Sequence, residues 1–432
     1  MTIGGLAPRR TFSALRHPHF RRFWFGGLVS LTGSWVQITA QSWLVYDLTG
    51  SPFMLGTVML ANTIPTMLLG LFGGVIADRS EKRHLLIATQ STFMLVAIAL
   101  ALLTLTGRIT VWYILSLSMI SGIAAALDMP TRQSLIAHLV DREDLLNAIA
   151  LNSAAFNGSR IVGPAIAGLI IDQLGNRSGP GWSFAVNSVS YLAVIGALAT
   201  IAVNSRPADG ARRPVLGELR EGVAFAWRHP VLRALLGLLA VTGVFGFSFH
   251  VLMPVFARDV LHVPARGYGI LLTASGIGAT IGVLTFATVH PARLGAVILS
   301  TSTVFVAMLA AFAASATYSL SLVLLLVLSG AMTAYLSATN TLIQTIVPDT
   351  LRGRVMSLYM LAFFGTAPLG GLLMGSLATA LGSQTAVLIG AAVCGLGIVT
   401  MWSAVREITR DAWRPAESRA PAEGYGSATG QP

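Results

Sequence analysis

Long apolar runs alternate with short polar links along most of the chain. A membrane-spanning helix needs about 20 apolar residues, and runs of about this length lie at residues 22–46, 51–77, 85–106, 110–128, 147–171, 182–203, 231–257, 267–289, 294–315, 317–340, 355–380 and 385–405. They are continuously apolar, whereas the strands of a membrane barrel alternate polar and apolar side chains. Because only helices and closed barrels satisfy backbone polar groups in lipid, the pattern predicts an all-α polytopic membrane protein with twelve transmembrane helices.

Basic residues lie mainly on one side of the predicted membrane. Charged residues make up only 10% of the 432 residues, against about 25% in a soluble protein. With a cytosolic N-terminus, Arg160 lies within a span, and the outer side carries only four of the 28 Lys and Arg residues: Arg108, Arg177, Arg258 and Arg266. This positive-inside bias predicts that both termini are cytosolic. The net charge of +11 then reflects topology and contact with anionic lipid on the cytosolic face, and not binding to nucleic acid.

The chain lacks the residues that several classes of function need. Lys82 is the only lysine, so the chain has neither a Walker A lysine nor a buried lysine for a pyridoxal Schiff base. Cys394 is the only cysteine, which excludes an intramolecular disulfide and a thiolate metal site. A His-Glu-x-x-His zinc motif is absent from the sequence. We therefore expect no enzyme activity, no cofactor and no bound metal.

Two repeated sequence patterns divide the chain into halves. Residues 16–21 and 228–233 share an Arg-His-Pro-x-x-Arg pattern before the first and seventh runs, and residues 131–164 resemble residues 339–368 at a similar offset. Parallel repeats with a binding site between them are a transporter architecture. The predicted segments are an N-terminal cytosolic segment at 1–19, a six-helix bundle at 20–203, a linker at 204–230, a second six-helix bundle at 231–405 and a disordered cytosolic tail at 406–432.

The linker contains an amphipathic stretch. Leu216, Leu219, Val223 and Trp227 recur at helical spacing, with charged residues between them. This spacing predicts an interfacial helix on the cytosolic face of the membrane.

A charged cluster separates the second and third runs and reads GVIADRSEKR over residues 74–83. Its pattern, carried by Gly74, Asp78, Arg79, Lys82 and Arg83, resembles the signature loop of the major facilitator superfamily. The resemblance covers residues 15–405 and implies two pseudo-symmetric six-helix bundles around a cavity that opens alternately to each side.

The resemblance also implies a gate. Asp78 would face the start of the span near Val355, where a helix dipole favours an anion, and Arg79 or Arg83 would pair with Asp128. This latch would hold the halves together on the cytosolic side in the outward-facing state. The alternative is a solvated loop that serves topology alone.

Two further stretches resemble the branch that includes macrolide efflux pumps and the enterobactin exporter. The first reads DMPTRQ over residues 128–133, in which Asp128 and Arg132 flank a proline, and the alternative there is a helix end with charges reaching water. The second contains Gly163, Pro164 and Gly168 in the fifth span. In the family this motif seals the outer half and accompanies export, whereas the alternative is ordinary tight packing.

Arg160 is the only basic residue deep in a predicted span, about 20 Å from its start. A charge at this depth costs at least about 2.5 kcal/mol and must face protein or water. Arg160 can bind an anionic or polar substrate group or couple to protonation, with Asn157 one turn away, or it can cap carbonyls between helices. No carboxylate lies at mid-membrane, so Asp47, Asp128 and His250 are the remaining candidates for proton coupling.

Candidate cavity residues are polar or aromatic side chains in spans one, seven and ten, three of the four spans that line the cavity in the superfamily: Gln37, Gln41, Phe249, His250, Tyr335 and Asn340. Each of them can instead form interhelical hydrogen bonds or pack in the core. We interpret the chain as a monomeric secondary transporter of the bacterial inner membrane. It would export a moderately hydrophobic small molecule, drug-like or a siderophore, by proton antiport. The alternatives are an importer or uniporter of a small metabolite, and a transport-inactive sensor or assembly partner.

Overall fold

The structure, a computed structural model, describes residues 12–201 and 215–411. The side chains of residues 71–75, 77–78, 215–220, 364, 401 and 403–411 lie outside this description. Every regular element in the described ranges is helical. The first half contains η1 (Ser13–Arg16), α1 (Pro18–Thr49), α2 (Pro52–Arg79), α3 (Lys82–Leu105), α4 (Val111–Leu139) and α5 (Leu145–Ala199).

The second half is more interrupted than the first. Its elements are α6 (Val215–Arg228), α7 (Pro230–Val241), η2 (Thr242–Gly246), α8 (Phe249–Val255), η3 (Phe256–Val260), α9 (Ala265–Phe286), η4 (Pro291–Arg293), α10 (Leu294–Ala314), α11 (Tyr318–Ile346), α12 (Asp349–Met360), η5 (Leu361–Gly365), α13 (Ala367–Leu381) and α14 (Ser383–Asp411). Three of them, η2, η3 and η5, are π-helical turns: η2 connects α7 to α8 and η5 connects α12 to α13 within the seventh and eleventh spans, and η3 ends the seventh span.

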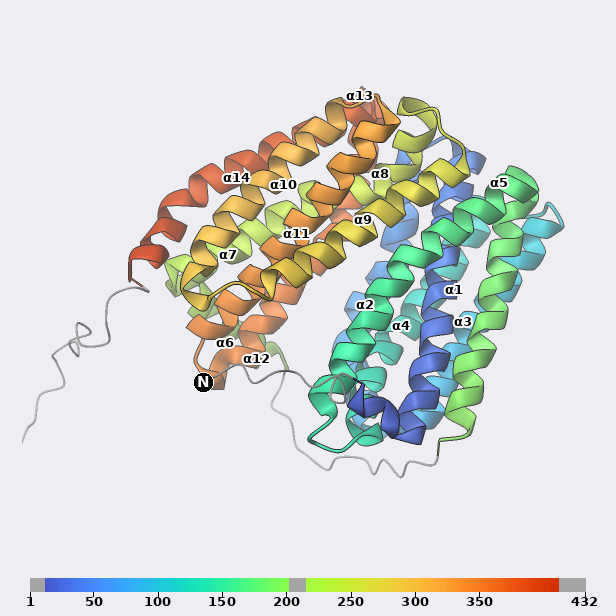
Figure 1. Cartoon of the computed structure of the whole chain (residues 1–432), viewed down its shortest axis with the longest axis horizontal. Helices are drawn as coiled ribbons and strands as arrows, with labels where there is room; N and C mark the ends of the chain where they lie inside the picture. Colours follow the sequence, from blue (N-terminus) through green and yellow to red (C-terminus); the bar gives the residue numbers. More distant parts are fainter. Residues whose placement is uncertain (1–11, 202–214, 412–432) are drawn as a thin grey trace, which may run out of the picture.

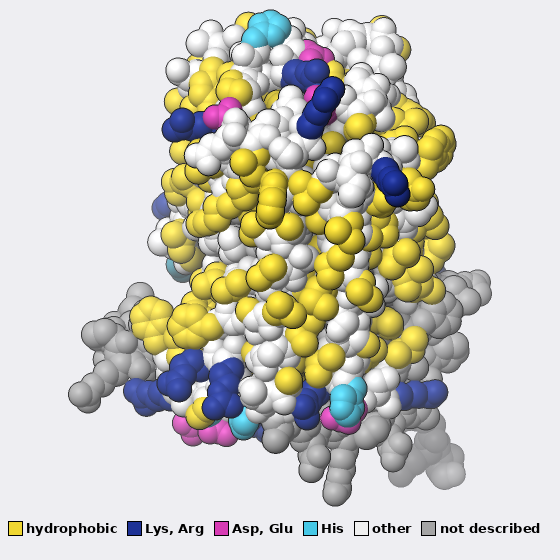
Figure 2. Space-filling view, turned by 90° about the vertical axis from the view of Figure 1, so that its right-hand side faces the viewer, with side chains coloured by type: hydrophobic (Ala, Val, Ile, Leu, Met, Phe, Trp, Pro, Cys, Tyr) yellow, Lys and Arg dark blue, Asp and Glu magenta, His cyan; other side chains and the backbone are white. Residues whose placement is uncertain are grey.

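The helices account for the predicted spans. Ten helical stretches in the described residues are long and apolar enough to cross a membrane. One of these, α5, holds two predicted runs, because Gly175 adopts φ 77° and bends the chain back between them. The 32-residue helix α1 holds the first run. The predicted all-helical, multi-pass fold is confirmed, and Figure 2 shows a broad hydrophobic belt with most charged side chains toward the two ends of the molecule.

The helices form two groups that meet at one end. Figure 1 shows α1–α5 on one side and α7–α14 on the other, close together near α8 and α13 and diverging toward α6 and α12. Helix α5 packs along α9, and α2 packs along α13. One hydrophobic cluster crosses between the groups and contains Trp43, Phe249 and Tyr268. The predicted domain boundaries stay predictions, since residues 202–214 and 412–432 lie outside the described part.

Two helix boundaries differ from those predicted. The fourth run was predicted to end at residue 128, with a possible helix end at Pro130, but α4 continues to Leu139. The Thr131 hydroxyl donates to the Leu127 carbonyl (2.6 Å), next to the Ala126 carbonyl that loses its helical N–H partner at Pro130. The eleventh span begins at Asp349 rather than near Val355, because its first turns are polar and escaped the hydropathy pattern.

Each half begins with a helix that docks on a later helix of the same half. In the first half, η1 lies against the start of α5: the Ser13 hydroxyl donates to Asp144 (2.5 Å), His17 Nε2 contacts the same carboxylate (2.8 Å), and the Ala14 N–H donates to Asn147 (3.0 Å). In the second half, α6 docks on α12 through an ion pair between Glu221 and Arg354. The predicted interfacial stretch is therefore a helix.

Docking of η1 is expected to depend on pH. Hydrogen bonds from Ser13 and His17 hold the pKa of the Asp144 carboxyl below its ordinary range. Docking is therefore favoured above the ordinary carboxyl pKa of roughly 4 and is lost as the pH falls through the lower pKa of the docked state. Asp144→Asn is expected to speed hydrogen exchange at the Ala14 amide several-fold at neutral pH, whereas the exposed Asp141→Asn serves as the control. Equal exchange in both variants would contradict this role.

Candidate functional site

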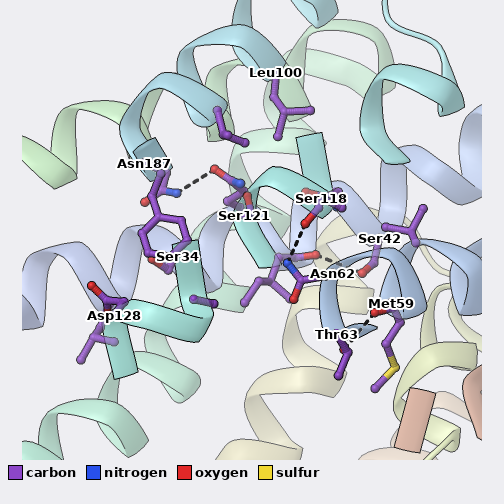
Figure 3. Close-up of a pocket in the computed structure, with 18 of the residues that line it drawn as sticks. Ser34, Ser42, Met59, Asn62, Thr63, Leu100, Ser118, Ser121, Asp128 and Asn187 are labelled. Carbon is purple, nitrogen blue, oxygen red and sulfur yellow. Dashed lines mark hydrogen bonds between the residues drawn. The ribbon is translucent and has the colours of Figure 1, made fainter. Parts of the chain in front are cut away.

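A cavity of about 550 Å³ lies among the helices of the first half (Figure 3). All five long helices of that half line it, and Phe247, His250 and Val251 are its contributions from the second half. Its polar lining consists of Ser30, Ser34, Gln37, Gln41, Ser42, Asn62, Thr63, Gln90, Ser118, Ser121, Asp128, Arg132, Asn187, Tyr191 and His250. A ligand in this cavity would therefore meet mainly the first half.

Carboxamides are tied to neighbouring helices along the wall. Asn187 of α5 donates to Gln37 of α1 (2.7 Å). Ser118 of α4 accepts from Gln41 through its hydroxyl (3.0 Å) and from Asn62 through its carbonyl (3.3 Å). These bonds fix the direction of each amide, so the wall presents donors and acceptors in set positions.

Asp128 forms one charged end of the cavity. Its Oδ1 accepts from the Thr89 hydroxyl (2.8 Å) and from Gln90 Nε2 (2.7 Å), and its Oδ2 accepts from Arg132 Nε (3.3 Å). The guanidinium of Arg132 lies over the ring of Phe23, 5.5 Å from its centroid. The other amide atom, Gln90 Oε1, is buried without a protein partner. This end can therefore accept a hydrogen bond from a ligand.

The predicted pairing of Arg79 or Arg83 with Asp128 is not made in this structure. Arg83 donates instead to the carbonyls of Leu198 (2.9 Å) and Ala199 (2.7 Å) at the end of α5. The last carbonyls of a helix lack the regular i+4 N–H partner and attract a cation through the helix dipole. Arg79 is exposed at the end of α2.

The remaining residues of the loop are placed only in part. Lys82 is buried at the start of α3, and Glu81 pairs with His84 (2.8 Å). The side chain of Asp78 and the surroundings of Gly74 lie outside the described residues, so the proposed approach of Asp78 to the eleventh span stays a prediction.

Apolar side chains also line the cavity. They include Val45, Leu55, Val58, Val96 and Leu100, all buried hydrophobic residues of α1, α2 and α3. The cavity thus joins an ionic, hydrogen-bonding end to an apolar wall, which suits an amphiphilic ligand.

Polar contacts join the two halves at one end, which we term the closed end and define by Trp43, Tyr46 and Asp47 of α1, Arg258 and Asp259 of η3, and Tyr268 of α9. Asp47 pairs with Arg258 (2.9 Å), and the Tyr46 hydroxyl donates to Asp259. The rings of Trp43 and Tyr268 stack at 5.5 Å. Asp47, predicted as a coupling residue, is thus part of a contact between the halves.

Glycines allow the backbones of the two halves to touch beside this contact. A Cβ at Gly168 of α5 would lie 2.8 Å from the Ala265 carbonyl oxygen of α9, and one at Gly269 would lie 2.4 Å from that of Pro164. Gly163 faces Trp35 of α1 in the same way (2.4 Å). The predicted fifth-span motif therefore lies where α5 meets α1 and α9.

Opening of the closed end is expected to become easier when its ion pair is removed. Arg258 is about half exposed (46%) and Asp47 a quarter (25%), so the pair is worth less than about 1 kcal/mol. Arg258→Ala should raise the open population a few-fold, measured as the distance between spin labels at the exposed Leu48 and His262. The swap Asp47→Arg with Arg258→Asp should restore the wild-type distances. A swap that behaves like the single variant would refute a direct ionic contribution.

Arg160 and Asn157 do not line this cavity. Arg160 lies at the junction of the two halves, with its guanidinium over the Trp35 ring, 5.9 Å from its centroid. The Asn157 amide donates to the Ser153 carbonyl of its own helix (2.9 Å). Asn157 therefore satisfies part of its hydrogen-bonding capacity locally.

Some of the residues predicted to line the cavity do so, and others do not. Gln37, Gln41 and His250 line the cavity. Phe249 and Tyr335 do not, and this expectation is corrected, because both are 1% exposed and packed in hydrophobic clusters.

Asn340, also expected on the cavity, accepts a hydrogen bond from Gln344 on the same face of α11 (2.6 Å). Sequence reasoning missed Asn62, Gln90, Ser118, Asn187 and Tyr191 as lining residues. The sequence did contain a signal for one wall of the cavity. Polar residues recur in the first span at the spacing of one helix face: Ser30, Ser34, Gln37 and Gln41.

Together, the two helical groups, the cavity and the contacts at the closed end define a membrane transporter of the major facilitator type. The chain belongs to the transmembrane secretion effector family of this superfamily, whose family model matches residues 9–422. This family and the relatives below consist of transporters and not enzymes, as predicted.

Three relatives are similar over most of their length. The multidrug efflux pump Tap of Mycolicibacterium fortuitum is 28% identical over 83% of this chain and 88% of its own. The staphyloferrin A transporter of Staphylococcus aureus is 27% identical over 82% and 87%. The enterobactin exporter EntS of Citrobacter koseri is 25% identical over 89% and 90%.

Solved structures share the fold. The nucleoside transporter NupG has a TM-score of 0.73 at 14% identity, covering 89% of this chain and 99% of its own. A bacterial homologue of the lysosomal transporter Spinster has a TM-score of 0.68 at 17% identity, covering 95% and 100%.

Proposed function

We propose that this protein exports a small amphiphilic molecule across the bacterial inner membrane by alternating access. The observation that carries the proposal is the cavity, which combines the hydrogen-bonded Asp128–Arg132 pair with an apolar wall. Relatives described as a multidrug efflux pump and an enterobactin exporter support the same direction of transport.

The positive-inside bias assigns the two ends to the two sides of the membrane. It places η1, α6 and α12 in the cytosol, so that the closed end faces outward. The halves diverge toward the cytosol (Figure 1), and we assign this structure to the inward-facing state. In the opposite state, Gly74, Asp78, Arg79, Lys82 and Arg83 would form the cytosolic latch.

Protons are the proposed driving ion, and Asp128 is the proposed carrier. It is a carboxylate on the cavity wall, 13% exposed, and it already accepts three hydrogen bonds. Binding of a substrate donor near Asp128 and binding of a proton would compete for the same oxygens. Such competition is what antiport requires, and Arg132 pairs with the same carboxylate.

Inside-out vesicles and an efflux-deficient strain test this function. The strain expressing the protein should accumulate less of at least one amphiphilic antibiotic or dye than the strain with an empty vector. Inside-out vesicles should take the same compound up when their interior is acidic. Unchanged accumulation and no uptake for every compound of a broad panel would overturn the proposal.

Import of a polar metabolite is the second candidate. The carboxamides of the cavity favour it, since amides bind the hydroxyl groups of sugars and nucleosides: Gln37, Gln41, Asn62, Gln90 and Asn187. Right-side-out vesicles decide between the candidates. Proton-driven uptake of a polyol or nucleoside into them, with no uptake of amphiphiles by inside-out vesicles, would establish import.

A further inference from the structure

Arg160 is a cation in the middle of the membrane, and the described residues give it no anionic partner. It lies fifteen residues after Leu145 and fifteen before the bend at Gly175, about 22 Å from either. In the described part of the chain, no carboxylate or carbonyl accepts a hydrogen bond from its guanidinium. The alternative role of capping carbonyls between helices is therefore not seen. A cation at this depth is costly unless something compensates it.

Arg160 lies where the two halves meet. Thr273 of α9 donates to the carbonyl of Ile161, the next residue (2.9 Å), and a Cβ at Gly276 would lie 3.1 Å from the Arg160 carbonyl oxygen. The guanidinium carbon lies over the Trp35 ring, 5.9 Å from its centroid. This cation–π contact uses none of the N–H donors in a hydrogen bond to an oxygen, so they can bind another group.

His250 lies at the edge of the cavity on α8, which contacts α1, the helix that carries Trp35. Its ring lines the cavity, and its Nε2 is buried with no partner among the described residues. With the proton on Nε2, a neutral imidazole donates one hydrogen bond. Arg160 and His250 are therefore donor groups from opposite halves that lack acceptors in the described part of the chain.

The described acidic groups near the junction are engaged elsewhere. Asp47 pairs with Arg258, Asp259 accepts from Tyr46, and Asp128 pairs with Arg132. Asp172, on the same helix as Arg160, is exposed. The junction is thus electropositive, which favours an anion and disfavours a cationic ligand.

We propose that Arg160, Trp35 and His250 form a binding site for an anionic group, so that the transported amphiphile carries a carboxylate. The carboxylate binds the guanidinium through charge-assisted hydrogen bonds, and the apolar body lies along the cavity wall. This inference rests on the proposed function and narrows its substrate class to acidic amphiphiles. It also explains why the sequence keeps a costly charge at this depth.

Matched fluorescent probes test the inference on the full-length protein in lipid nanodiscs. The probes are 6-(dansylamino)hexanoate and its uncharged amide, which share the same apolar body. The wild type is expected to bind the carboxylate at least about tenfold more tightly than the amide, the scale of a hydrogen bond to a charged group. Arg160→Gln should abolish this difference, Arg160→Lys should keep part of it, and Arg177→Gln, an exposed arginine on the same helix, should leave it unchanged.

The wild-type comparison needs no variant, so it stands even if a substitution impairs folding. Equal binding of the two probes, or no binding of the carboxylate, would overturn the anionic site. If the vesicle assay nevertheless shows export of neutral or cationic compounds, the proposed function survives this failure. A carboxylate preference that Arg160→Gln leaves intact would equally refute the role of Arg160.

Discussion

Asp128→Asn is expected to uncouple transport from the pH gradient. Exchange of one proton for each substrate molecule across one pH unit supplies about 1.4 kcal/mol, which is tenfold accumulation. Asparagine keeps the size of the side chain and one acceptor for Thr89 or Gln90, but it carries no proton through the cycle. Accumulation in inside-out vesicles with an acidic interior should therefore fall about tenfold per pH unit, to the level of passive equilibration.

The exposed Asp172→Asn serves as the matched control for Asp128→Asn. It removes an acid from another span without touching the cavity and should keep the full dependence on the gradient. Counterflow exchange of labelled substrate, which needs no gradient, should persist in Asp128→Asn and would show that the variant folds. Full gradient dependence in Asp128→Asn would remove this carboxylate from the coupling mechanism.

Gly168→Ala is expected to destabilise the closed end. The new Cβ would lie within 2.8–3.2 Å of backbone atoms of Ala265, Arg266 and Gly269, and backbone cannot rotate away as a side chain can. Overpacking of this kind costs about 1–3 kcal/mol, so the population with this end closed should fall about tenfold or more. Spin-label distances between Leu48 and His262 should lengthen, and transport should slow.

Gly158→Ala is the control for Gly168→Ala because it adds the same methyl group to the same helix. A Cβ at Gly158 has no neighbour within 4 Å, so the label distances and transport should stay close to those of the wild type. If the two variants give the same distances, the close contact between α5 and α9 does not govern closure.

Much of the fold was readable from periodicity and repeats. The apolar runs predicted the membrane-spanning helices, and the repeated Arg-His-Pro pattern marks the two places where the first and seventh predicted spans follow a docked helix, at His17 and His229. Two predicted helix boundaries were wrong, because hydropathy alone did not indicate where these helices end or begin. Pro130 does not end α4, and the polar first turns of α12 gave no apolar signal.

The candidate site was readable only in part. Polar residues inside an apolar run mark a protein-facing side, which identified Gln37 and Gln41, but the rotation of each helix about its axis is set by packing. Phe249 therefore lies in the core although its neighbour His250 lines the cavity. The i,i+4 spacing within α4 specifies Arg132 as a partner of Asp128, but the other two partners, Thr89 and Gln90, come from α3, and no spacing within α4 specifies them.

The uneven division of the cavity lining has a consequence for how the cargo range can evolve. Because only Phe247, His250 and Val251 come from the second half, the genetic changes that alter cargo should concentrate before residue 192. In a directed-evolution experiment, a library confined to α1–α5 should therefore yield most of the variants with a new cargo range. The second half can then stay unchanged between pumps that transport different substrates.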